Sequence, residues 1–149
     1  MNPVFHGDRL TLAPFAPDDI DLSYAMFTDP AVMKYTGGPM SEAAIRAKLP
    51  DWVRRGGNGC IGVWTVSDRR TGEKYGSAAL LPIPVEERET DYSLVTPGKM
   101  PNGDIEIGYY LKRAAWGRGY ATEAARRLLE FAFEEGQLAE VVATFDKNN

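Results

Sequence analysis

A short loop with two glycines, followed by a strongly patterned helix, constrains this chain more than any other feature. The segment "YYLKRAAWGRGYATEAARRLLEFAF" predicts the end of a strand, a loop containing Gly117 and Gly119, and a helix from Thr122 to Glu135. Glycines let the backbone turn tightly, and the unpaired N–H groups at a helix start can hold an anion. The pattern therefore predicts either an anion-binding loop or a plain strand-to-helix turn.

Patterns along the whole chain predict five strands and three helices. Alternating or apolar runs indicate strands at 9–15, 60–68, 74–83, 104–111 and 139–145. Helical patterns cover 17–27 and 41–55 as well as 122–135, with Ser41 as an N-cap and a bend or interruption at Pro50. The order is therefore β-α-α-β-β-β-α-β, which is typical of an α/β or mixed α+β fold.

Length and composition indicate a single domain over residues 1–149. The net charge of −4 argues against general binding to nucleic acid, which needs a basic surface. No apolar run is long enough to span a bilayer, and nothing at the start resembles a signal peptide. Cys60 is the single cysteine and His6 has no companion histidine, so neither a disulfide within the chain nor a metal site is expected. We expect a cytoplasmic protein with no nucleic-acid or membrane partner.

One connection is unusually long. Residues Pro82 to Gly103 carry four prolines and many charges between two predicted strands. Such a segment is either a surface excursion or a lid beside a site on the neighbouring strands.

Two nucleotide-binding motifs fit the glycine loop poorly. A P-loop is excluded because Gly-Lys-Ser/Thr is missing at the required spacing. A dinucleotide-binding loop is disfavoured because Thr122 stands where a small third residue should pack, and because five residues separate the strand from the first glycine.

The segment "EIGYYLKRAAWGRGYATEAARRLLEFAF" closely resembles the central motif of the GNAT superfamily of acyl-CoA-dependent N-acyltransferases. That motif, Gln/Arg-x-x-Gly-x-Gly/Ala, falls on residues 116–121, with Trp116 in place of Gln or Arg. The form "WGRGYATEA" and the openings "RLTLAPFAPDDID", "FTDPAVMKYTGG" and "SEAAI" resemble the branch of ribosomal-protein N-terminal acetyltransferases. The resemblance covers nearly the whole chain. It implies a central mixed, mostly antiparallel sheet flanked by helices, with the last helix and strands of the fold absent.

The resemblance also implies a site for acetyl-CoA as the acyl donor. Backbone amides of the glycine loop would hold the pyrophosphate, and Arg118 would either add its charge or remain solvated. The preceding strand would pair with the pantetheine arm, and the N–H of Tyr109 or Tyr110 would polarise the thioester carbonyl. Asn149 would reach toward the pantetheine. The donor-binding residues implied are Gly108, Tyr109, Tyr110, Leu111, Trp116, Gly117, Arg118, Gly119, Tyr120, Ala121, Thr122 and Asn149. Gly108 is also consistent with a bulge in its strand.

The implied reaction is acetyl transfer to a primary amine, either of a peptide N-terminus or of a small molecule. An ammonium group must lose a proton before it can attack, and Glu106 matches the family position for that base, with Asp104 as a weaker candidate. Without the resemblance, Glu106 would be read as a solvent-facing or arginine-paired carboxylate. Tyr35 is the best candidate for lining the acceptor groove.

The general acid of the family lies on a helix beyond Asn149. A non-catalytic acyl-CoA-binding or regulatory module is therefore the alternative function, and a homodimer is expected by resemblance only.

Overall fold

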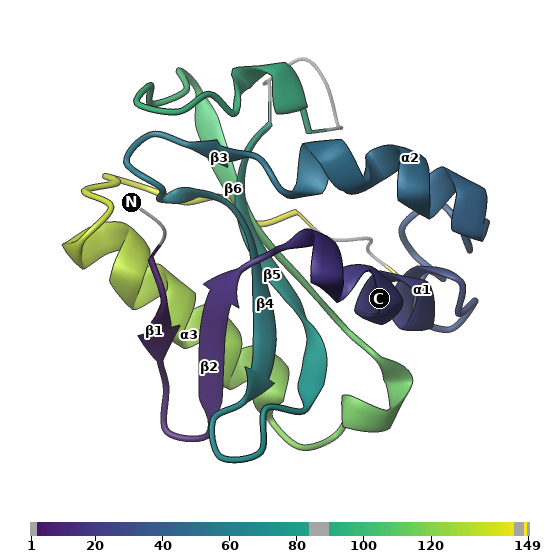
Figure 1. Cartoon of the computed structure of the whole chain (residues 1–149). Helices are drawn as coiled ribbons and strands as arrows, with labels where there is room; N and C mark the ends of the chain where they lie inside the picture. The colour runs from purple at the N-terminus through teal and green to yellow at the C-terminus, as the bar shows by residue number, and fades with distance from the viewer. Residues whose placement is uncertain (1–2, 84–89, 145–147, 149) are drawn as a thin grey trace.

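The computed structural model describes residues 3–83, 90–144 and 148, and these form one open sheet with helices on both faces (Figure 1). The strand order is β1-β2-β4-β5-β6, with β3 paired to β4, and every pair of named strands is antiparallel. The strands are β1 (Phe5–His6), β2 (Leu10–Pro14), β3 (Arg55–Gly56), β4 (Ile61–Asp68), β5 (Lys74–Ile83) and β6 (Asp104–Leu111). The expected mixed, mostly antiparallel sheet is confirmed.

One long helix covers the first face of the sheet. Helix α3 (Tyr120–Glu134) buries Leu128 and Phe131 against side chains of the sheet, among them the fully buried Trp64. This cluster is the larger of the two hydrophobic cores. Gly136 follows the helix and donates its N–H to the Phe131 carbonyl (2.8 Å), as expected for a residue that ends a helix.

Two helices cover the second face. Helix α1 (Ile20–Phe27) follows the short 3-10 turn η1 (Pro17–Asp19), and α2 (Glu42–Trp52) begins after Ser41, whose Oγ accepts the Ala44 N–H (3.1 Å). The expected N-cap is confirmed. The expected interruption at Pro50 is wrong, because α2 continues through Pro50 and ends two residues later, at Trp52. No helix in the described part of the chain is both long and apolar enough to cross a membrane.

The described part of the last expected strand, 139–144, forms one bridge, and Phe145 lies outside the described residues. Val142 lies parallel to β6, donating its N–H to Ile105 and accepting from Ile107 (both 2.9 Å). The strands β1 and β3 were not expected, since two-residue strands leave too short a pattern to recognise.

The long connection between β5 and β6 is partly ordered against the sheet. Pro82 belongs to β5, and the described part from residue 90 onward contains the 3-10 turn η2 (Tyr92–Leu94) and the buried Val95. Residues 84–89 lie outside the described chain. The described portion is a packed connection rather than a wholly exposed excursion.

Candidate functional site

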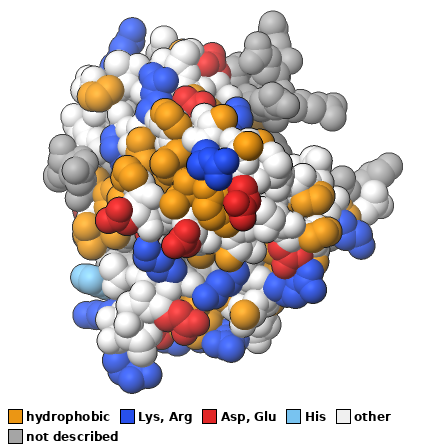
Figure 2. All heavy atoms as spheres, turned by 45° about the vertical axis from the view of Figure 1, so that its right-hand side comes forward, with side chains coloured by type: hydrophobic (Ala, Val, Ile, Leu, Met, Phe, Trp, Pro, Cys, Tyr) orange, Lys and Arg blue, Asp and Glu red, His pale blue; other side chains and the backbone are white. Residues whose placement is uncertain are grey.

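A large cleft opens along β6, with a volume of about 1310 Å³. It is lined by the loop at the start of α3, by the second half of β6, and by residues of α1 and the segment that follows α1. Figure 2 shows one face of the molecule on which hydrophobic side chains gather near the centre, with charged side chains around them. The cleft brings together most of the residues expected to form a site.

The glycine loop forms one end of this cleft. Gly117 and Gly119 both have left-handed φ angles, of 76° and 80°, and no atom lies within 4 Å of a Cβ added at Gly117. Gly119 is the residue before α3, and no side chain caps this helix end. Among the described residues, none accepts a hydrogen bond from the N–H groups of residues 117–122. These groups and the positive end of a fifteen-residue helix make the loop suitable for an anion.

An arginine from the other end of the chain holds this loop. The Arg9 guanidinium donates to the carbonyl of Arg118 (2.8 Å) and to Glu123 Oε1 (2.7 Å), and it lies 4.6 Å from the centre of the Tyr120 ring. This contact fixes the orientation of the Arg118 carbonyl within the glycine loop. Arg9 and Glu123 were not expected in the site, since no local pattern in the sequence relates residues 114 positions apart.

No described segment pairs with the outer edge of β6 in its second half. Since the Ile107 N–H bonds to Val142, alternation along the strand turns the backbone groups of Tyr109 and Leu111 outward too, and those of Gly108 and Tyr110 toward β5. Of the two amides expected to polarise a carbonyl, the geometry favours Tyr109. No bulge occurs at Gly108, because β5 and β6 pair without a register shift from Asp104 to Leu111.

Trp116 closes the end of this edge. Its indole Nε1 donates to the Leu111 carbonyl (2.9 Å), while its ring remains 46% exposed. The Leu111 carbonyl is therefore already paired, which leaves its N–H and both backbone groups of Tyr109 as the outward-facing groups in this part of the strand.

Glu106 lies on the opposite face of β6 from Ile105 and Ile107. The two isoleucines pack on the core beneath α3, and Glu106 lines the cleft. Thr144 Oγ1 donates to Glu106 Oε2. Among the described residues that line the cleft, only Lys34 and Glu106 carry a charge. Within the described part of the chain, no arginine forms an ion pair with Glu106.

Comparisons with known proteins agree with this geometry. Residues 9–149 match the Acetyltransferase (GNAT) domain family. The uncharacterized protein YkkB of Bacillus subtilis is 32% identical over 133 residues, which are 89% of this chain and 69% of that protein. The FsC-acetyl coenzyme A-N(2)-transacetylase of Aspergillus fumigatus is 30% identical over 142 residues, which are 94% of this chain and 57% of that protein.

The chain belongs to the GNAT acetyltransferase family.

Solved structures support the same fold. A GNAT acetyltransferase from Bacillus anthracis superposes with a TM-score of 0.75 at 22% identity, over 99% of this chain and 76% of that one. The ribosomal L7/L12 N-terminal acetyltransferase RimL superposes with a TM-score of 0.66 at 15% identity, over 96% of this chain and 71% of that one. The expected resemblance to the GNAT family and its ribosomal-protein branch is therefore confirmed at the level of fold.

The remaining expected residues of this GNAT acetyltransferase are placed as follows. Tyr120, Ala121 and the exposed Thr122 line the cleft. The Tyr120 side chain is largely buried and its ring stacks on Tyr75 (centroids 4.3 Å apart). Arg118 is exposed. Asn149 lies outside the described residues.

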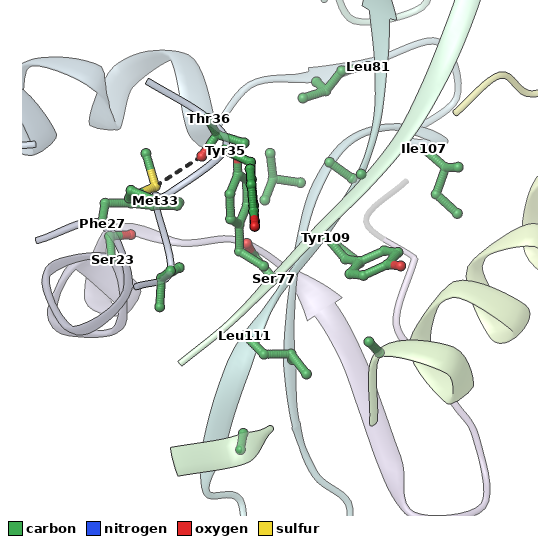
Figure 3. A pocket seen from close by; sticks show the side chains of 18 of the residues that line it. Ser23, Phe27, Met33, Tyr35, Thr36, Ser77, Leu81, Ile107, Tyr109 and Leu111 are labelled. Atoms are coloured by element: carbon green, nitrogen blue, oxygen red, sulfur yellow. Dashed lines mark hydrogen bonds between the residues drawn. The ribbon is translucent and has the colours of Figure 1, made fainter. Parts of the chain in front are cut away.

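Tyr35 lines the cleft on the other side of β6 from Tyr109. Figure 3 shows the Tyr35 ring between β6 and the segment after α1, whereas the Tyr109 ring points away from Tyr35, toward α3. The strand thus divides the cleft into a side near α3 and the glycine loop and a side near α1 and α2. We call them the donor side and the acceptor side, after the roles that the family resemblance implies.

An ion pair ties the two sides together. Arg113, in the 3-10 turn η3 (Arg113–Ala115), binds both carboxylate oxygens of Asp29, which follows α1. The hydrogen bond from this guanidinium holds the pKa of Asp29 below its ordinary value. The pair fixes the acceptor side to the segment that leads into the glycine loop.

Proposed function

We propose that this GNAT acetyltransferase transfers an acetyl group from acetyl-CoA to a primary amine, of a small molecule or of a peptide N-terminus. The observation that carries the proposal is the run of N–H groups at residues 117–122, which have no acceptor among the described residues and lie next to the second half of β6. Acetyl coenzyme A also appears in the name of the Aspergillus relative.

The donor side suits acetyl-CoA in two respects. The amides of the glycine loop and the N-terminus of α3 offer several donors to a pyrophosphate, and this does not depend on the side chain at Trp116. The outward amide of Tyr109 offers one more donor, for a carbonyl oxygen. Acetyl-CoA, when bound, supplies an acetyl group activated as a thioester.

Glu106 is the residue proposed to prepare the acceptor. A protonated amine has no lone pair, so a base must first take a proton from its nitrogen. The Glu106 carboxylate lies on the acceptor side of β6, where it can attract an ammonium group and accept that proton, directly or through a water molecule. Asp104, also in β6, is retained as the weaker candidate, since its side chain is not among the residues that line the cleft.

Calorimetric titration tests the donor site. Acetyl-CoA and, separately, NAD are titrated into the parent protein, Thr122→Glu and Thr122→Gln. A glutamate in the first turn suits the helix dipole but repels a pyrophosphate, so we expect Thr122→Glu to weaken acetyl-CoA binding at least about tenfold. Thr122→Gln, of similar size and uncharged, should bind almost as tightly as the parent. Absence of acetyl-CoA binding, or stronger binding of NAD, would overturn the proposal.

Release of the CoA thiol in the presence of an amine tests the reaction. Amine-dependent release that Glu106→Gln abolishes supports catalysis. Binding of acetyl-CoA without release with any amine, and unchanged by Glu106→Gln, would instead indicate the acyl-CoA-binding module named above.

A further inference from the structure

The acceptor side of the cleft has a floor made of small residues. Gly108 in β6, Ala79 in β5 and Val63 in β4 lie in one row across the sheet, since Gly108 pairs with Ala79 and Ala79 pairs with Val63. Paired residues of antiparallel strands point to the same face. A Cβ added at Gly108 would meet no atom within 4 Å, and Ala79 is partly exposed although it lies in a central strand. The row is therefore the bottom of an open slot.

The slot runs across the strands and away from Glu106. Three neighbouring strands span two inter-strand spacings, which is about 10 Å. Glu106 lies two residues before Gly108 on the same face of β6, so it stands about 7 Å along the strand from the β6 end of the row. An acceptor amine held by Glu106 would place its substituent over this floor.

Aromatic rings form the walls of the slot. Phe27 contacts both Trp52 and Tyr110, with ring centroids 5.1 Å apart in each case. Phe15 meets Trp52 edge to face at 6.3 Å, and Tyr35 lines the same side of the cleft (Figure 3). Rings at these distances and angles present edges and faces on which a further ring can pack.

The distribution of charge in the cleft completes the description of the acceptor. Lys34, the second charged residue of the lining, is exposed, with its Nζ 5.2 Å from the centre of the Tyr35 ring. Among the described lining residues, no second carboxylate is present to pair with another ammonium group. A polyamine would bring a second ammonium group, for which this part of the lining offers no second carboxylate.

We infer that the acceptor is a primary amine joined by a short chain to an aromatic ring, with the amine at Glu106 and the ring in the slot over Gly108, Ala79 and Val63. This inference rests on the proposed function. It identifies the acceptor by its chemistry, which a free arylalkylamine and a peptide with an N-terminal phenylalanine share.

Amine binding to the full chain tests the inference separately from acetyl-CoA binding. The change in tryptophan fluorescence is followed while 2-phenylethylamine, the peptide Phe-Gly-Gly, ethanolamine or spermidine is added without any CoA. We expect at least one of the two aromatic amines to bind at least about tenfold more tightly than ethanolamine and spermidine. Equal or stronger binding of ethanolamine or spermidine would overturn the inference.

Two variants locate the ring. Ala79→Leu fills the slot and should remove the preference for aromatic amines, whereas Ala25→Leu, at an exposed position of α1, should leave it unchanged. Tyr35→Ala removes one wall without crowding the sheet, and should weaken aromatic amine binding about threefold or more. Thermal unfolding shows whether each variant is folded. If folded Ala79→Leu and Tyr35→Ala both kept the full preference, the inference would be wrong.

The two proposals fail in different experiments. Absence of acetyl-CoA binding by the parent protein would overturn the proposed function. Absence of a preference for aromatic amines, in a protein that binds acetyl-CoA, would overturn the inference about the acceptor alone.

Discussion

Arg9 Nε lies 2.7 Å from Glu123 Oε1, and the Arg9 backbone N–H donates to the other oxygen of the same carboxylate (2.9 Å). The residue before β2 is thereby joined to the first turn of α3. The remaining guanidinium nitrogens are free to hold the Arg118 carbonyl, so this pair determines how the glycine loop faces the cleft. Glu123 is also well placed for the positive end of the helix.

Replacement of Arg9 should therefore weaken donor binding. We expect Arg9→Met to raise the dissociation constant of acetyl-CoA about three- to tenfold, because the loop would lose the contact that orients it. Arg9→Lys should recover little of this loss, since a lysine cannot reproduce the fork of donors. Calorimetric titration measures the effect. Arg46→Met, which removes an exposed arginine whose partner is the Tyr24 hydroxyl, is the control. Equal affinity in Arg9→Met and the parent would show that the loop does not need the brace.

Glu106→Gln should lower kcat by about a hundredfold or more, because general-base catalysis contributes roughly 10²–10⁴. Acetyl-CoA affinity should change little, since Glu106 lies on the acceptor side of β6. Steady-state kinetics at a fixed pH measures kcat for the parent and the variant, and acetyl-CoA titration measures the donor affinity. A kcat near the parent value in Glu106→Gln would point to Asp104 or another base.

Two glycines on neighbouring strands should respond in opposite ways to alanine. A Cβ at Gly76 would lie 2.0 Å from the Tyr110 carbonyl oxygen, whereas one at Gly108 would meet nothing within 4 Å. Gly76→Ala must displace β6 and should cost about 2 kcal/mol or more in the free energy of unfolding. Gly108→Ala should be neutral, or stabilising by up to about 1 kcal/mol. Urea unfolding of both variants gives the comparison, and a stable Gly76→Ala protein would contradict the packing between β5 and β6.

Stability should fall in acid through two carboxylates. The Arg113 guanidinium lowers the pKa of Asp29, and backbone N–H groups, that of Thr71 first, lower the pKa of Asp68. A carboxylate with a lowered pKa in the folded state stabilises the protein above its unfolded pKa of about 3.9 and loses that contribution as the pH falls through its folded pKa. We expect Tm to drop below about pH 4.

Asp29→Asn distinguishes the contribution of the ion pair. In this variant the fall of Tm with acid should be shallower than in the parent, and added salt should reduce the difference because both partners reach solvent. Parallel acid profiles for the two proteins would show that the pair with Arg113 adds no pH-dependent stability.

The main helices and strands could be predicted from the sequence because their signals are local. The alternation of Leu10 and Leu12, the cap at Ser41 and the spacing of apolar residues in α3 each depend on a few neighbouring residues. The bounds expected for β5 and β6 agree with the structure. The last strand was overestimated, since Val142 is the one residue of the described part, 139–144, that pairs with β6.

The glycine loop was also recognisable from the sequence. Its motif combines two positions that need left-handed backbone with the start of a strong helix, and all of these lie within one short segment. The same holds for Glu106, whose face of β6 follows from the alternation of Ile105 and Ile107.

Tertiary structure alone decided the rest of the site. Arg9 and Glu123, or Asp29 and Arg113, meet only when the sheet is assembled, since no local pattern relates residues 114 or 84 positions apart. The row of Gly108, Ala79 and Val63 depends on the pairing register of three strands, and a shift of one residue would turn other side chains toward the slot. The sequence determined which local elements form and where an anion could bind, because those depend on adjacent residues. The shape of the acceptor side was set by long-range packing.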